Sequence, residues 1–412
     1  MAANGAHAIE PATSPASAAT AAPATGAAVE LISAVVSPVP ARHSALALGQ
    51  LAAAVTDAGV WGQVTDLLAT HRVAALAAIR LAGVDRVPSD VRAQLENERR
   101  DSAFHALAAS AELTAVLRTL RAAGISAMPF KGPALALVAY GDIGVRRMVD
   151  VDVVVDPVDR QRAFAALAAA GWRWPAAGER TRDVLHRWLG HVPIERSDAT
   201  YGVELHWRFA QLALPWTLPV AEVLRCARPI ASAPDALWVV PRPSDHLLLL
   251  AWHGTRHGWT TLEWIASFAH VMQACGEHDA GAALGVARGA GGARALGIAV
   301  AVACEVIDVG VPAAFESVAA DPVVRAESAN IVARLWTTPA GVAGEEQSWG
   351  RHGYWLRCLD GGASRARFLA LTALLPTERE LEMVRLPDSL AGLYYPLHLA
   401  RVAARALLRR TA

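Results

Sequence analysis

Two aspartates stand two residues apart in the most strand-like run of the sequence, MVDVDVVVD. Residues i and i+2 of a strand project from the same face, so Asp150 and Asp152 are predicted to lie side by side. Adjacent carboxylates repel each other unless a cation lies between them, and a divalent metal ion is the usual cation in proteins. The surrounding valines predict a buried strand with an acidic end. The alternative is that both acids face water.

A third acid follows in the run GVELHWRF, which is also strand-like. Glu204 and His206 are two residues apart and therefore share a face. On a strand beside the aspartates, Glu204 would complete a metal site or accept the proton of an attacking hydroxyl group. Taken alone, Glu204 would more often be a surface residue of an edge strand.

A single lysine is found among the 38 basic residues, and a glycine follows it. Lys131 and Gly132 lie between a predicted strand and a predicted helix, where backbone N–H groups and the helix N-terminus favour an anion. The lysine ammonium suits a point contact with phosphate, and glycine lets the phosphate approach the backbone. Chance placement of one lysine is the alternative. The loop before Asp150 adds Arg146 and Arg147 as candidates for the same phosphates.

Two histidines, His253 and His257, are four residues apart on a later predicted helix, a spacing that can hold a metal ion. No glutamate stands between them in the HExxH manner, which argues against a zinc protease. This helix face is a candidate to touch phosphate or acceptor, although ordinary packing with hydrogen bonds explains such a pair more often.

The elements that position these residues form a short alternating series. Strands are predicted at 125–130, 148–156, 191–197 and 202–209, and helices at 133–140 and 159–171. This β-α-β-α-β-β order predicts an α+β fold whose core is a small mixed sheet within residues 125–212.

Helical regions are predicted on both sides of this core. Residues 1–42 are rich in Ala, Pro, Ser and Thr and predict a disordered tail. Residues 43–124 predict a helical N-terminal region, and residues 213–412 a mostly helical C-terminal region. One side of a helix in the N-terminal region is expected to carry Phe104, Leu107, Leu113, Leu117 and Leu120.

The overall composition narrows the class of function. Hydrophobic residues make up 54% and charged residues 18%, which suits a folded core. The formal net charge is zero, which argues against a nucleic-acid partner. The N-terminus lacks a secretory signal, the four cysteines show no CxxC spacing, and no run reaches about 18 apolar residues. We therefore expect a cytoplasmic protein without a transmembrane segment.

A resemblance to a known family extends over roughly residues 60–275. It is carried by the run LRAAGISAMPFKGPALALVAYGDIGVRRMVDVDVVVDPVDRQRAFAALAAAGW and by GVELHWRF. Both runs resemble the bacterial family of uncharacterised nucleotidyltransferases, which belongs to the DNA-polymerase-beta-like nucleotidyltransferase superfamily. The resemblance implies that Asp150 and Asp152 are metal ligands and Glu204 the third acid. The superfamily has a Gly-Ser pair where this chain has Lys131-Gly132-Pro133, so Lys131 is expected to supply the phosphate contact of the missing serine.

The same resemblance implies an activity: transfer of a nucleoside monophosphate from an NTP, such as ATP, with Mg²⁺ or Mn²⁺. Lys131, with Arg146 or Arg147, would bind the triphosphate. The acceptor would be a hydroxyl or phosphate group on a small molecule or a peptide, because family members occur beside peptide natural-product genes. The alternative is a catalytically silent scaffold of the same fold that binds a nucleotide or a peptide.

Overall fold

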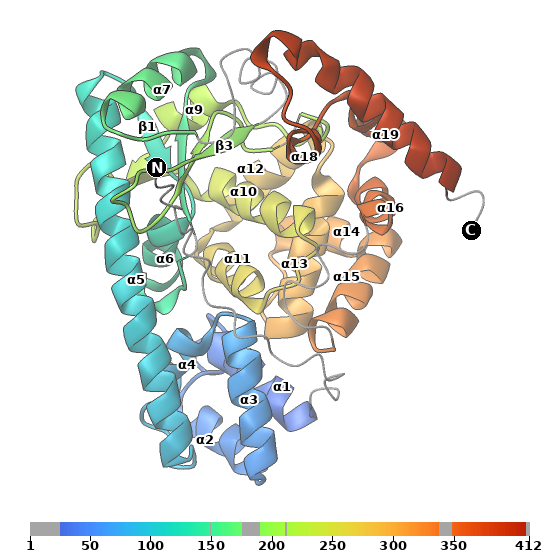
Figure 1. The fold of residues 1–412 in the computed structure, drawn as a ribbon. Helices are drawn as coiled ribbons and strands as arrows, with labels where there is room; N and C mark the ends of the chain where they lie inside the picture. Colours follow the sequence, from blue (N-terminus) through green and yellow to red (C-terminus); the bar gives the residue numbers. More distant parts are fainter. Residues whose placement is uncertain (1–24, 149, 175–189, 211, 338–347, 409–412) are drawn as a thin grey trace.

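A computed structural model describes residues 25–148, 150–174, 190–210, 212–337 and 348–408. Helices make up most of the molecule, and a small sheet lies at one side between the N-terminal and C-terminal helices (Figure 1). The predicted α+β fold, a small mixed sheet with helical flanks, is confirmed. No helix within the described ranges is long and apolar enough to cross a lipid bilayer.

The sheet contains four strands in the order β1-β2-β4-β3. Their bounds are Ala127–Pro129 for β1, Val151–Val155 for β2, His191–Ile194 for β3 and Val203–His206 for β4. The central strands β2 and β4 are parallel, and each edge strand is antiparallel to its neighbour. In the parallel register Asp152 pairs with Glu204, and Val154 with His206. Paired residues point to the same side of a sheet, so the acids predicted to meet lie on one face.

The two faces of β2 meet different surroundings. Val151, Val153 and Val155 belong to a hydrophobic cluster shared with α5 (Ser89–Ala122) and α7 (Arg160–Ala169). Val154 belongs to a second cluster, shared with α10 (Pro243–Arg256). Because side chains alternate along a strand, Asp152 lies on the same side as Val154. The acidic positions of this strand therefore face the C-terminal helices.

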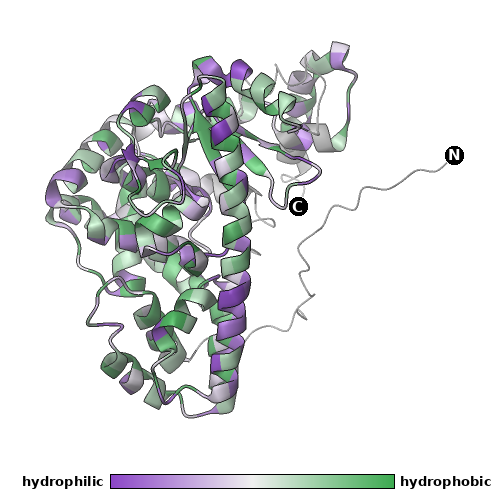
Figure 2. Cartoon of the chain, turned by 90° about the vertical axis from the view of Figure 1, so that its left-hand side faces the viewer, coloured by the Kyte–Doolittle hydropathy of each residue, from purple (hydrophilic) through white to green (hydrophobic). Residues whose placement is uncertain are grey.

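Helix α5 runs along one side of the molecule, from the N-terminal helices to the sheet (Figure 1). Figure 2 shows its hydrophilic first part and its more apolar second part. The predicted buried side is confirmed for Leu113, Leu117 and Leu120 but is wrong for Phe104 and Leu107, which are 69% and 63% exposed. Small residues one or two positions away, Ser102, Ala106 and Ala109, form the buried stripe there instead, at the spacing that a helix requires.

Helix α1 (Gly26–Val36) corrects the end of the predicted disordered tail. The Thr25 side chain accepts a hydrogen bond from the backbone N–H of Ala28 and caps the helix. Its apolar residues, including Leu31, Ile32 and Val35, are fully buried in the larger hydrophobic cluster. This burial outweighs the alanine-rich, uncharged composition on which the prediction was based. The rest of the predicted tail, residues 1–24, lies outside the described residues.

The remaining elements surround the sheet. Before the second strand lie α2 (Ala45–Ala54), α3 (Ala58–Thr70), α4 (Ala74–Leu81), α6 (Gly132–Tyr140) and the 3₁₀ turn η1 (Ile143–Val145). After the fourth strand lie α9 (Val220–Arg225), the β5–β6 pair (Arg228–Pro229, Val239–Val240), α11 (Leu262–Ala274), α12 (Glu277–Gly289), α13 (Ala293–Ile307), α14 (Glu316–Ala319), α15 (Pro322–Leu335), α16 (Ser348–Cys358), α17 (Gly361–Leu374), α18 (Glu378–Met383) and α19 (Tyr394–Leu408). The N-terminal and C-terminal helices share one hydrophobic cluster, so the two flanks pack together.

Candidate active site

Asp152 is the most buried acid on the polar face of the sheet, with 1% of its side chain exposed. Its Oδ1 lies 2.6 Å from Lys131 Nζ and 3.0 Å from His206 Nε2. Its Oδ2 is buried and has no hydrogen-bond partner among the described residues. Burial alone would raise the pKa of Asp152, but Lys131 and His206 hold this pKa well below its usual range. Asp152 is therefore an anion with one oxygen left for a further ligand.

Asp150 lies just before β2, two residues from Asp152. Burial and the neighbouring charge of Asp152 raise the pKa of Asp150 to about 6. Each acid thus makes ionisation of the other more costly, as the spacing in the sequence predicts. A cation bound between them would remove this repulsion.

Strands β3 and β4 bring an acid and two imidazoles to the same place. His206 Nε2–H donates both to Asp152 Oδ1 and to Glu204 Oε2, the latter at 3.2 Å. Burial alone would lower the pKa of His206, but these two hydrogen bonds raise it above its usual value. His191 Nε2 lies 3.7 Å from Glu204 Oε2, and its ring stacks on that of His206 with centroids 4.5 Å apart. One ligand atom from each of His191, Glu204 and His206 lies within 4.8 Å of the other two.

Lys131 is placed by the tight connection between β1 and α6. Gly132 has a φ of +57°, a left-handed conformation in which any other L-residue would be strained. A Cβ atom on Gly132 would also lie 3.4 Å from the backbone oxygen of Asp150. Glycine therefore allows the Lys131 loop to approach the Asp150 loop closely, and the N-terminus of α6 begins beside the acids.

Helix α10 faces the site from the other side. His246 Nε2 lies 3.0 Å from the carbonyl oxygen of Phe130 and holds the helix against the end of β1. His253 and Arg256 follow on the same face, two and three turns further along. The guanidinium of Arg256 contacts His257 Nε2 at 2.9 Å. The negative charges of Glu204, Asp152 and Asp150 also interact electrostatically with it.

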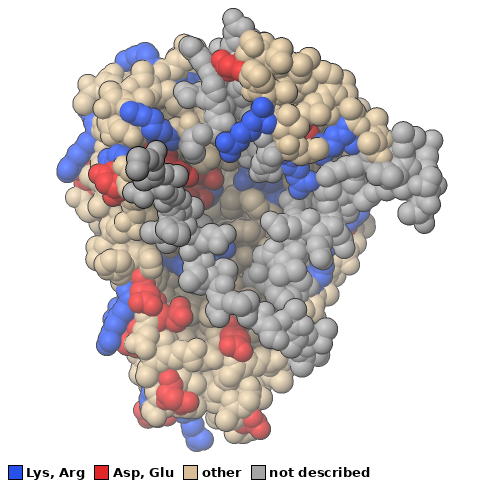
Figure 3. All heavy atoms as spheres, in the orientation of Figure 1, with Lys and Arg blue, Asp and Glu red and all other residues tan. Residues whose placement is uncertain are grey.

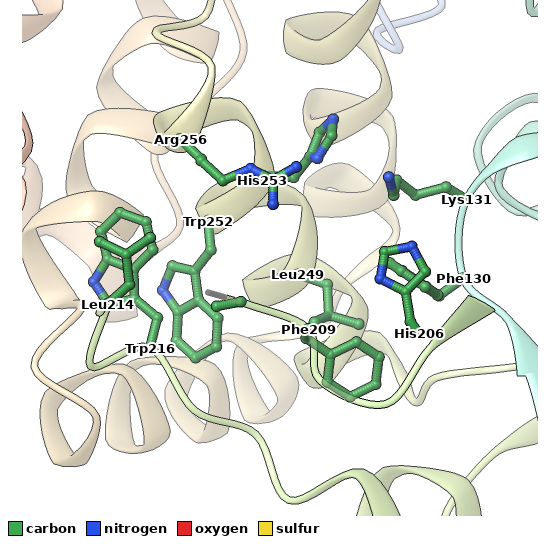
Figure 4. A pocket seen from close by; sticks show the side chains of 11 residues that line it. Phe130, Lys131, His206, Phe209, Leu214, Trp216, Leu249, Trp252, His253 and Arg256 are labelled. Carbon is green, nitrogen blue, oxygen red and sulfur yellow. The ribbon is translucent and has the colours of Figure 1, made fainter. Parts of the chain in front are cut away.

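A pocket opens between this helix and the sheet. Figure 4 shows Lys131 and His206 on one side of it, and His253 and Arg256 on another. Figure 3 shows acidic and basic side chains near the hollow in the middle of this face of the molecule. The pocket is lined by Phe130, Lys131, His206, Phe209, Ala210, Leu214, Trp216, Leu249, Trp252, His253 and Arg256. The pocket therefore combines basic side chains with apolar and aromatic ones, and Lys131 links it to Asp152 of the sheet.

Comparison with known proteins agrees with this arrangement. The family model described as "Uncharacterised nucleotidyltransferase" matches residues 57–308, more than half of the chain. The chain belongs to this nucleotidyltransferase family. No curated protein matches the chain. The matched segment contains all four strands of the sheet and helices α5 and α10, so it includes every candidate residue named above.

Two of the predicted phosphate ligands, Arg146 and Arg147, lie in the loop before β2. Arg146 Nε forms an ion pair with Glu263 Oε1 of α11 at 2.5 Å, and both side chains are nearly buried. Its charge still acts on Asp150 and lowers the pKa of that acid against the effect of burial. Arg147 is exposed. Arg146 thus fixes the loop to α11, and a phosphate role for either arginine stays a prediction.

His191 and Arg256 were not among the residues predicted from the sequence. His191 begins a predicted strand. Its antiparallel pairing with His206, which brings it to the site, is visible only in the structure. Arg256 stands between the two predicted histidines, three residues after His253, so the helical spacing that selected the histidine pair also pointed to it. The rings of His253 and His257 lie 4.6 Å apart next to Trp264, and their contact with phosphate stays a prediction.

Proposed function

We propose that this nucleotidyltransferase moves a nucleoside monophosphate group from an NTP, such as ATP, to a hydroxyl or phosphate group of a small-molecule or peptide acceptor. The observation that carries the proposal is the register of the two parallel strands, which pairs buried Asp152 with Glu204. Asp150 lies two residues away on the same strand segment, and Lys131 contacts Asp152 directly. Acids for a metal ion and a cation for phosphate are therefore neighbours.

Asp150, Asp152 and Glu204 would hold Mg²⁺ or Mn²⁺. Carboxylate oxygens are the protein ligands that these ions prefer. The buried Oδ2 of Asp152 lacks a hydrogen-bond partner among the described residues. Burial, and after it the neighbouring charge of Asp152, raises the pKa of Asp150. Both features fit a cation at this point. When bound, the metal polarises the α-phosphate and neutralises charge on the departing pyrophosphate.

The chain's own residues would position the two substrates. Lys131, the N-terminus of α6 and Arg256 would bind the triphosphate, with Arg146, Arg147, His253 and His257 as further candidates around it. The acceptor oxygen attacks the α-phosphorus, and the bond between that phosphorus and the pyrophosphate oxygen breaks. Glu204, whose side chain is 27% exposed, would accept a hydrogen bond from the acceptor and orient it, while the acceptor's proton passes to water.

One observation favours a second candidate, a silent nucleotide-binding or peptide-binding scaffold. Lys131 contacts Asp152, and His206 donates hydrogen bonds to both Asp152 and Glu204. These contacts compensate the acids without any metal ion. A fold that has lost catalysis would keep such ion pairs and still bind a nucleotide.

The two candidates are separated by incubating the full chain with each NTP and a mixed pool of acceptors, with and without Mg²⁺. Nucleotide binding, pyrophosphate release and the intact masses of the products are measured together. Transfer predicts Mg²⁺-dependent pyrophosphate release that Asp152→Asn removes and the exposed control Asp66→Asn keeps. Nucleotide binding without pyrophosphate release would favour the scaffold. If neither nucleotide binding nor pyrophosphate release is observed, transfer and the nucleotide-binding scaffold are both refuted.

A further inference from the structure

We propose that His191, Glu204 and His206 form a binding site for a first-row transition-metal ion of borderline softness, such as Zn²⁺ or Co²⁺. These residues lie on β3 and β4, at the edge of the sheet away from β1. The site shares Glu204 with the acids that would hold Mg²⁺. It rests on the placement of its ligands and does not require nucleotidyl transfer.

The backbone register brings the three ligands together. His191 and His206 are directly paired across the antiparallel strands, and their rings stack with an interplanar angle of 17°. Glu204 Oε2 lies 3.2 Å from His206 Nε2 and 3.7 Å from His191 Nε2. A tetrahedral zinc ion with bonds of about 2.0–2.1 Å keeps its ligand atoms about 3.3 Å apart. The His206–Glu204 spacing already matches this value.

His191 supplies the adjustment that the site still needs. The three ligand atoms fall within 4.8 Å of one another, so the widest spacing must shrink by up to about 1.5 Å to suit a tetrahedral ion. The His191 side chain is 25% exposed, whereas that of His206 is 5% exposed. The more exposed ring can turn toward the ion while the buried ring and the carboxylate stay in place.

The chemistry of the ligands selects the metal. Two imidazoles and one carboxylate suit Zn²⁺, Co²⁺ and related ions, whereas Mg²⁺ prefers an all-oxygen set. Three protein ligands leave a fourth position open for water or substrate, as in catalytic rather than structural zinc sites. Asp152 is not counted as a ligand, because Lys131 already contacts its Oδ1. Metal binding through His206 Nε2 would replace the proton on that nitrogen, and with it the hydrogen bonds to Asp152 and Glu204. The negative charge of Asp152 still favours a cation nearby.

The test uses the untagged full chain after its metals have been removed by a chelator. Co²⁺ is titrated and followed by its visible ligand-field absorption, and Zn²⁺ binding is measured by calorimetry. We expect one ion per chain and an affinity at least about tenfold lower in His191→Ala. The exposed histidine variant His278→Ala should match the wild type. Because His206 is buried, His206→Gln is included with its thermal unfolding curve as a check on folding.

Lys131→Met gives an opposite and independent readout. Removing an ammonium group next to Asp152 lowers the positive charge beside the site, so Zn²⁺ and Co²⁺ should bind more tightly in this variant. A purely structural role for the histidines predicts no such gain.

The proposal is overturned if the wild type binds neither ion in a one-to-one ratio, or if His191→Ala binds both ions as tightly as wild type. Its failure can be told apart from failure of the proposed function. If the wild type does not bind Co²⁺ but still transfers nucleotide with Mg²⁺, the result counts against the histidine site alone. Intact Co²⁺ binding in a chain that never transfers nucleotide supports the site and counts against transfer alone.

Discussion

Replacing Lys131 with Met should destabilise the folded chain by about 3 kcal/mol at neutral pH, because Asp152 would lose its closest cation. The pKa of Asp150 indicates the size of this loss of stability. In nearly the same surroundings, but without an ammonium group in contact, burial and the neighbouring acid raise the pKa of Asp150 from 3.8 to about 6. A shift of that size corresponds to about 3 kcal/mol. His206 remains to compensate Asp152 in the variant, so we do not expect a larger loss.

The sign of the pH dependence follows from the same groups. In the wild type the pKa of Asp152 is lowered, so its contribution to stability is present above the unfolded-state value and is lost as pH falls below it. In Lys131→Met the pKa of Asp152 should be raised, so the acid penalises folding at neutral pH and ceases to do so once it is protonated. The difference in stability between wild type and variant should therefore shrink between about pH 7 and pH 4.

Urea unfolding of both proteins across this pH range measures the effect. Arg118→Met is the matched control, because it also removes one cation from an ion pair, with Asp235, but Arg118 is 69% exposed. The control should lose much less stability, because solvent screens an exposed ion pair. Equal losses in the two variants, or a loss for Lys131→Met that does not change with pH, would refute the reasoning.

Two further predictions concern stability. Burial lowers the pKa of His71, His246 and His270 to about 4 in each case, so the unfolded chain binds protons first as pH falls from 6.5. The free energy of unfolding should therefore drop between about pH 6.5 and pH 4, by up to about 3 kcal/mol per histidine. A free energy from urea unfolding that stays constant over this range would contradict the prediction. Gly132→Ala should cost about 1–3 kcal/mol because of the positive φ and the nearby backbone oxygen of the acid loop. Gly62→Ala, in open space on helix α3, should instead raise the free energy of unfolding by about 0.5–1 kcal/mol. Similar shifts in the thermal unfolding temperature of the two glycine variants would refute this account.

The sheet and its acidic face could be predicted from the sequence because both follow from local patterns. Alternating valines and acids specify a strand and its two faces, and Gly132-Pro133 specifies the start of a helix directly after Lys131. These patterns also placed Asp150 and Asp152 on one face. The pairing of Asp152 with Glu204 needed the additional assumption that their strands are neighbours, which the structure bears out.

The features that were missed depend on contacts between distant segments. The role of His191 follows from the antiparallel register of β3 on β4, and nothing in its own neighbourhood indicates that register. Arg256 matters because α10 packs across the polar face of the sheet, held there by the contact between His246 and the Phe130 carbonyl. Similarly, composition alone could not show that α1 would be covered by other helices, or that Phe104 would be left exposed.

The most direct test of the central claim is the rate of Mg²⁺-dependent pyrophosphate release from an NTP by the wild type and by the double variant Asp150→Asn/Asp152→Asn. If these acids hold the catalytic metal, the double variant should lose at least about a hundredfold in rate while still unfolding cooperatively near the wild-type temperature. A double variant that releases pyrophosphate at the wild-type rate would contradict the assignment.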